Sequence, residues 1–222
     1  MTTTPWTKPS GSRWTRVIWC YSRRHRPSPS SPHRIPMATE KDNTPALYVV
    51  CLGGRADGCK VEMHDIAFAV GSDLESTHDQ LLDQWFGNPE GLHVDAFARV
   101  EQVPGYRVFL SDKPAYNRVR LYFVNIGGYA PGELWERHAY ALYAGQSVSE
   151  VKKRARKELL VGRDSVHRDD LYDIDDILEV RAGDWHIHLE ADPAAGEPAV
   201  TNGYFPIPRR TIADWQSRRL ES

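Results

Sequence analysis

The sequence predicts an α+β protein made of two similar halves. Each half has the element order β-β-α-β-β, and together they are expected to form a sandwich with approximate two-fold symmetry. The main observation is a repeat: LYVVCLGGRADGCKVEMHDIAFAVG (47–71) recurs without a gap, 74 positions later, as LYFVNIGGYAPGELWERHAYALYAG (121–145). Each copy holds two strand-like runs, and a segment with helical periodicity follows it. Because crossover helices are almost always right-handed, both helices should cover the same kind of sheet face.

The first half (46–115) begins with two predicted strands. The run LYVVCL (47–52) is apolar and ends at Gly-Gly, as a buried strand does where it meets a turn. The segment EMHDIAFAV (62–70) alternates, which indicates a second strand. One face of this strand carries Glu62, His64, Ile66, Phe68 and Val70. An acid and an imidazole are therefore expected at the end of an apolar face.

A helix and two further strands complete the first half. Ser72 or Asp73 is expected to cap the helix. Three- and four-residue spacing predicts that the helix buries Leu74, Thr77, Leu81, Trp85 and Phe86. HVDAFARVEQV (93–103) predicts a third strand, and YRVFL (106–110) predicts a fourth after a Pro-Gly turn. One face of the third strand is expected to carry Val94, Ala96, Ala98 and Val100.

The second half (116–190) repeats this plan. LYFVNI (121–126) and WERHAYALYA (135–144) predict its first two strands, and a helix is expected over 148–160. Ser147 and Glu150 have the spacing of a capping box at the start of that helix. DLYDIDDILEV (170–180) and WHIHLE (185–190) predict the last two strands. Residues 191–222 are rich in Pro, Gly and Ala at their start and are expected to form an extended tail, with a possible short helix at 211–221.

The beginning of the chain has a different composition. Residues 1–36 contain seven of the 28 basic residues, no acid, many Pro and Ser residues and no apolar periodicity. We expect a disordered basic leader over 1–45 and a true start at Met37. A transit peptide and a genuine basic tail are the alternatives. Beyond residue 36 the chain has 21 basic and 30 acidic residues, a net charge of −9, which argues against nucleic-acid binding by the acidic body.

The composition also gives an expectation for the cellular compartment of the protein. No run approaches the roughly 20 apolar residues of a membrane-spanning helix, so no membrane association is expected. Cys20, Cys51 and Cys59 contain no C-x-x-C pair and are odd in number, which gives little support to a disulfide framework or a thiolate metal site. We expect a cytoplasmic protein, with Cys51 as a strand residue.

Two Glu-His pairs are the strongest candidate site. Glu62 and His64, and their counterparts Glu136 and His138, follow the Gly-rich segments GGRADG and GGYAPG. One interpretation is a polar latch in which hydrogen bonds between these side chains and the loop pin each loop. The other is a ligand or divalent metal site in each half, or one shared site on the two-fold axis. We interpret the glycines as turn residues, because a strand rather than a helix follows them.

More residues could join such a site. At the same shift of 74 positions, His93 and Asp95 match His167 and Asp169. These four are expected on a solvated or hydrogen-bonded strand face. If that face came near the Glu-His pairs, each half would offer two histidines and two carboxylates, enough for a metal centre.

The sequence has two further basic features. Arg55 would bring a positive charge to the first loop if an anion binds there. The basic face of the second predicted helix is expected to be a solvated surface, and an acidic protein or RNA partner is the alternative. Its members are Lys152, Lys153, Arg154, Arg156 and Lys157.

Three functions follow in order of preference. The first is binding of a small ligand or divalent ion at the Glu-His pairs. The second is a metal-dependent hydrolase that uses the same residues. The third is an interaction module acting through the basic helix. No Ser-His-Asp order, G-x-S-x-G elbow, Walker motif or dinucleotide fingerprint is present, so the sequence supports no particular catalysis and leaves the partner and the oligomeric state open.

Several motifs in order resemble one family. LGGRADGCKVEMHDIAFAVG, QWFG, GLHVDAF, VPGYRV, LYFVNIGGYAPGELWERHAYAL and HRDDLYDIDDILEV are similar to the family of domain of unknown function 1543, over roughly residues 47–190. The resemblance implies a bacterial cytoplasmic protein with a shared build and a start near Met37. It implies no activity and brings no catalytic residues.

Overall fold

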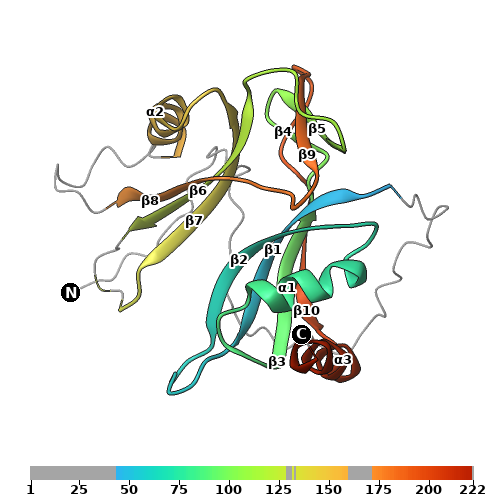
Figure 1. The fold of residues 1–222 in the computed structure, drawn as a ribbon. Coiled ribbons are helices and arrows are strands. Elements are labelled where there is room, and N and C mark those ends of the chain that lie inside the picture. Colours follow the sequence, from blue (N-terminus) through green and yellow to red (C-terminus); the bar gives the residue numbers. More distant parts are fainter. Residues whose placement is uncertain (1–43, 129–131, 133, 160–171, 222) are drawn as a thin grey trace, which may run out of the picture.

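The computed structural model describes residues 44–128, 132, 134–159 and 172–221. Met37, His167, Asp169 and almost all of the predicted leader lie outside these residues. The described chain is a mixed α+β fold, as predicted, with three antiparallel sheets and three α-helices (Figure 1). In chain order the elements are β1 Ala46–Arg55, β2 Met63–Gly71, the 3-10 turn η1 Glu75–Thr77, α1 His78–Gln84, β3 Asn88–Arg99, β4 Gln102–Val103, β5 Tyr106–Ser111, β6 Arg120–Gly128, β7 Arg137–Gly145, α2 Val148–Leu159, β8 Tyr172–Glu179, β9 His186–Ala191, β10 Val200–Pro206 and α3 Arg209–Leu220.

The first sheet has the strand order β10-β3-β1-β2, so β1 lies between β2 and β3. Side chains alternate along β1 because successive residues of a strand point to opposite faces. Tyr48, Val50 and Leu52 pack in the core beneath α1 and α3, whereas Leu47 and Val49 pack in a second, central core. One strand thus contributes to two apolar layers, which explains why its predicted run is apolar throughout.

The second sheet, β7-β6-β8, repeats this arrangement with α2 as its cover. Tyr122, Val124 and Ile126 of β6 pack with Val151 and Ala155 of α2. The equivalent faces of β1 and β6 therefore carry helices, which confirms the expectation for the helix positions. The predicted capping box is present in part: the Glu150 amide donates to Ser147 Oγ at 3.2 Å, whereas Glu150 Oε2 accepts at 2.8 Å from the amide of Gln146, the residue before Ser147.

A third sheet, β4-β5-β9, joins the two halves. Strand β5 of the first half pairs antiparallel with β9 of the second, from Tyr106 opposite Ala191 to Ser111 opposite His186. The central core lies against all three sheets. Its largest fully buried members are Leu47, Val100, Val103, Leu121 and Leu189. From one outside to the other, the layers are α1 with α3, the first sheet, the central core, the second sheet and α2 (Figure 1).

The prediction that Val94, Ala96, Ala98 and Val100 lie on one face of the third strand is wrong. Val94 packs in the core under the helices, whereas Ala98 and Val100 pack in the central core. The reason is a β-bulge: Leu52 pairs with Val94 and Cys51 with Ala96, which leaves Asp95 as the extra residue. A bulge reverses the side on which later side chains lie.

The stripe predicted for the first helix is also partly wrong. Phe86 is 56% exposed because α1 ends at Gln84, before this residue. Leu81 and Trp85 are buried as expected. Asp73 Oδ1 accepts a hydrogen bond from the Ser76 amide at 2.9 Å, so Asp73 organises the entry to this helical segment.

The C-terminal segment adds a strand and a helix to the first half. Strand β10 pairs with β3, and α3 packs Ile212 and Trp215 against the core that α1 covers. The Trp215 indole also donates to Asp83 Oδ1 at 2.9 Å. In the part of the chain that the structure describes, no helix has the length and apolar character needed to cross a membrane.

Candidate functional site

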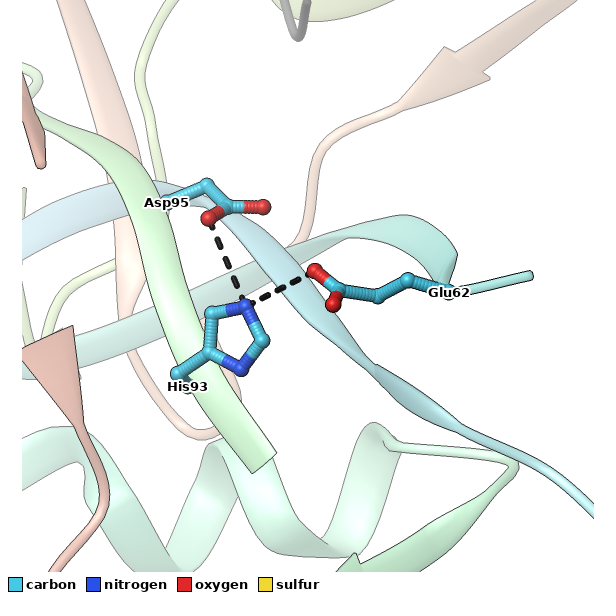
Figure 2. Close-up of side chains that lie close together, drawn as sticks. All are labelled: Glu62, His93 and Asp95. Carbon is cyan, nitrogen blue, oxygen red and sulfur yellow. Dashed lines mark hydrogen bonds and ion pairs between the residues drawn. The ribbon is translucent and has the colours of Figure 1, made fainter. Parts of the chain in front are cut away.

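The candidate site surrounds Gly53 on the middle strand of the first sheet. Gly53 pairs with His64 of β2 on one side and with His93 of β3 on the other. Asp95 joins them from the bulge in β3, and Glu62 comes from the loop just before β2. Figure 2 shows Glu62 and Asp95 approaching the same nitrogen of His93. The structure therefore brings together four residues that the sequence singled out separately.

The distances within this cluster are short. His93 Nε2 lies 3.0 Å from Glu62 Oε1 and 3.4 Å from Asp95 Oδ1. His64 Nε2 lies 3.0 Å from Asp95 Oδ2 and 3.5 Å from Glu62 Oε1. With metal–ligand bonds of about 2.1 Å, ligand atoms of one ion are about 3.0 Å apart in an octahedron and about 3.4 Å apart in a tetrahedron. The four distances are thus as short as those between the ligand atoms of a single divalent ion, although they join five atoms, because Asp95 contributes Oδ1 to one and Oδ2 to another.

A hydrogen bond to the backbone fixes the orientation of the His93 ring. Its side chain is only 5% exposed, and Nδ1 lies 2.9 Å from the carbonyl oxygen of Gly91. A carbonyl oxygen only accepts, so Nδ1 carries the proton and donates. The other nitrogen, Nε2, faces two carboxylates and needs either a proton or a cation to be stable there. Histidines that bind a metal usually donate their other ring N–H to an acceptor of this kind.

Asp95 places a buried carboxylate oxygen, Oδ2, in the cluster. Its ion-pair partner among the described residues is His64 Nε2, 3.0 Å away. A buried carboxylate is costly unless a positive charge balances it, and either protonated His64 or a metal ion would do so. Glu62, His93 and Asp95 offer ligand atoms that all lie within 4.8 Å of one another.

Gly53 provides the space for the cluster. A Cβ atom at this position would lie 2.5 Å from His93 Nε2 and 2.7 Å from Asp95 Oδ2. Any side chain here would therefore displace the two groups. Gly53 lies within β1 rather than in the turn that follows, so the interpretation of this glycine as a turn residue is wrong. A glycine is needed at this position because the backbone lies so close to the side chains of His93 and Asp95.

The second half brings a similar pair together. His138 Nε2 lies 3.6 Å from Glu136 Oε2, and His138 Nδ1 lies 3.1 Å from Asn125 Oδ1. The amide oxygen of Asn125 accepts from Nδ1, which leaves Nε2 directed toward the acid. Gly127 pairs with His138 as Gly53 pairs with His64.

The third strands do not follow the ungapped shift. Gly127 pairs with Asp173 in β8, so the position equivalent to His93 is Asp173, 80 residues later. His167 and Asp169, matched at 74 residues, lie outside the described residues. The difference arises because the second half has six more residues before its third strand. The strand pairing therefore shows that matching His93 with His167, and Asp95 with Asp169, was wrong.

The two basic features are not part of the cluster. Arg55 is exposed at the end of β1, and in the described part of the chain the ion pairs of the cluster do not include it. On α2, Arg154 turns inward: it donates to the Ala144 carbonyl at 2.7 Å and lies over the Tyr143 ring. Lys152, Lys153 and Arg156 remain on the helix surface around a shallow depression.

The cluster changes the acid–base behaviour of His64. The hydrogen bond to the Asp95 carboxylate is the main cause of a raised pKa of His64; partial burial opposes the rise, and the charges of Asp95 and Glu62 add to it. A raised folded-state pKa means that protonated His64 stabilises the metal-free protein. This contribution is complete below the unfolded-state pKa of about 6.5 and is lost as the pH rises through the folded-state pKa.

We therefore expect His64→Gln to lower the free energy of unfolding of the chelator-treated protein more at about pH 5.5 than at about pH 9. Urea unfolding of both proteins across this range measures the difference. A loss of equal size at both ends of the range would show that the ion pair of His64 does not contribute. His186→Gln, a substitution at an exposed histidine of β9, is the control, and the difference between the two variants isolates the contribution of the His64 ion pair.

Comparisons with known proteins agree with the resemblance found in the sequence. The profile described as Domain of Unknown Function (DUF1543) matches residues 59–110 and 133–182, one segment in each half. The crystal structure of protein Il1583 from Idiomarina loihiensis is similar with 32% identity and a TM-score of 0.57, over 74% of this chain and 99% of that chain. Among curated proteins, none matches the chain. The first matched segment contains Glu62, His64, His93 and Asp95.

Proposed function

Because the chain belongs to the DUF1543 family, whose description assigns no activity, we propose a function from the site itself: it binds a divalent metal ion through Glu62, His64, His93 and Asp95. The observation that carries this proposal is the Nε2 atom of His93. It is held by the Gly91 carbonyl behind it and faces two carboxylate oxygens at 3.0 and 3.4 Å. Two imidazoles and two carboxylates suit Zn²⁺, Mn²⁺, Fe²⁺ or Ni²⁺.

The polar latch explains part of the same geometry. A protonated His93 would bind Glu62 and so hold the loop before β2 in place. In the latch, a protonated His64 would face Asp95 Oδ2 at 3.0 Å, so hydrogen bonds alone can also hold the cluster together. The support for a metal ion is that ligand atoms of Glu62, His93 and Asp95 all lie within 4.8 Å of one another.

Metal analysis of the purified full chain tests the proposal. After incubation with Zn²⁺ and desalting, we expect His93→Ala to retain about one equivalent less than the wild type, namely the ion held in the first half. His186→Ala, at an exposed histidine outside the cluster, is the matched control and should keep the metal. A wild-type protein that retains no metal, with a His93→Ala variant that only unfolds at a lower temperature, would support the latch instead.

The second half is proposed as a related site built on Glu136 and His138. The support is the contact between these side chains and the identical pairing of Gly53 and Gly127 with their histidines. The equivalent registers, together with the two profile matches, also support an internal duplication in which the halves are related by an approximate two-fold axis.

A second proposed function is hydrolysis at the first site. A metal ion held by three of the four side chains would keep a position for water and lower the pKa of that water. Screening the metal-loaded protein against simple phosphate and carboxylate esters tests this use. Turnover that disappears in His93→Ala would support a hydrolase, and no turnover would leave metal binding alone.

A further inference from the structure

A tyrosine from the C-terminal strand lies on the candidate metal site. The rings of Tyr204 and His93 are 4.5 Å apart between centroids and inclined by 43°. Tyr204 is nevertheless 67% exposed, so most of its surface faces solvent. A large aromatic side chain that is this exposed adds little to the core. Its position over a proposed ligand needs another explanation.

The backbone of β10 is shaped to place this ring. Asn202 pairs with Ala96, and Phe205 pairs with Val94. Between these pairs, the two residues Gly203 and Tyr204 of β10 face the single residue Asp95 of β3, which is itself the bulged residue toward β1. Bulges of this kind often redirect a side chain toward a site.

Two further contacts hold the irregular segment in register. Phe205 packs edge-on against Phe97 with ring centroids 5.7 Å apart. A Cβ atom on Gly203 would lie 2.9 Å from the Phe205 ring, so a larger residue would disturb the bulge. The contact of Phe205 with Phe97, together with the absence of a side chain at Gly203, therefore supports the register of β10 and the place of Tyr204.

We propose that Tyr204 is a positioning residue of the metal site, which acts through its aromatic ring on His93. This inference rests on the proposed function. With Nδ1 bound to Gly91 on one side, the ring of Tyr204 restricts the remaining rotation of the imidazole. An imidazole bound to a metal is electron-poor, and the electron-rich face of a tyrosine ring stabilises it more than the free imidazole. The ring therefore strengthens metal binding.

This contribution belongs to the first site only. Strand β10 pairs with β3, and among the described residues no strand pairs in the same way with β8 of the second sheet. Tyr204 also lies beyond both segments that match the family profile. The C-terminal segment thus makes the two sites chemically different even though their Glu-His pairs are alike.

Titration of the full chain with Co²⁺, followed by its visible absorption, tests the proposal. We expect Tyr204→Ala to weaken Co²⁺ binding about two- to tenfold and to change the absorption of the bound ion, whereas Tyr204→Phe should bind as the wild type does. Tyr116→Ala is a matched control, because Tyr116 is 74% exposed and also contacts a histidine, His188, at 5.9 Å. This control should leave Co²⁺ binding unchanged.

Each other outcome has a definite meaning. Unchanged Co²⁺ affinity and absorption in Tyr204→Ala would overturn the positioning role while leaving the proposed function intact. An equal loss in Tyr204→Phe would overturn the role of the ring and assign the effect to the hydroxyl. A wild-type protein that binds no Co²⁺ would overturn the proposed function itself. Thermal unfolding of the metal-free variants shows whether each one is folded.

Discussion

Replacing Gly53 by alanine is expected to weaken metal binding by about a hundredfold or more. The added Cβ would lie 2.5 Å from His93 Nε2 and 2.7 Å from Asp95 Oδ2, so these two ligand groups could not keep their places. The backbone at Gly53 has no positive φ, so the substitution tests space and not backbone strain. Zn²⁺ competition with a coloured chelator measures the affinity of both proteins.

Gly196→Ala is the matched control for this substitution. The nearest atom to a Cβ at Gly196 is Gln102 Nε2 at 3.8 Å, which is an ordinary contact distance. We expect this variant to bind Zn²⁺ as the wild type does. Full Zn²⁺ affinity in a folded Gly53→Ala protein would place the metal away from the proposed ligands, and circular dichroism establishes that the variant is folded.

Replacing Phe123 by alanine is expected to lower the free energy of unfolding by about 3–5 kcal/mol. Phe123 is 4% exposed in the central core and contacts one ring from each sheet: Phe68 of β2 edge-on and Tyr140 of β7 stacked, both at 5.5 Å between centroids. Its loss leaves a cavity between the two sheets, and packed surroundings relax only partly around such a cavity. Urea unfolding measures the change.

Phe86→Ala removes the same side chain from an exposed position, where Phe86 is 56% accessible and contacts only Trp85 among the described ring contacts. The loss there is expected to be about 1 kcal/mol or less. Similar losses for the two variants would mean that the central core does not hold the two sheets together as described.

The repeat predicted the first two strands of each half well, for a physical reason. Between Gly53 and His64 and between Gly127 and His138 the chain has the same length, so an ungapped shift also reproduces the strand register. The third strands follow a connection that is six residues longer in the second half. Connections of this kind run over the surface and tolerate added residues, so nothing in the residue pattern shows where the shift changes.

The sequence predicted only part of the site. Glu62 and His64 were found because they are close in sequence and on one strand face. Their meeting with His93 and Asp95 depends on β1 lying between β2 and β3, which is a property of sheet order. The bulge at Asp95 was hidden because small apolar residues continue to alternate through it. Tyr204 was missed because the tail was expected to be extended, although Gly203 interrupting the run after Val200 could have indicated an irregular strand.

The pairing of β5 with β9 has a consequence for how the molecule unfolds. Strand β9 finds its strand partner in the other half, and β5 pairs with β4 on one edge and with β9 on the other, so neither half can lose its last strand without leaving backbone groups of the other unpaired. Heat should therefore melt the described body cooperatively, as one calorimetric transition and not as two separate domains.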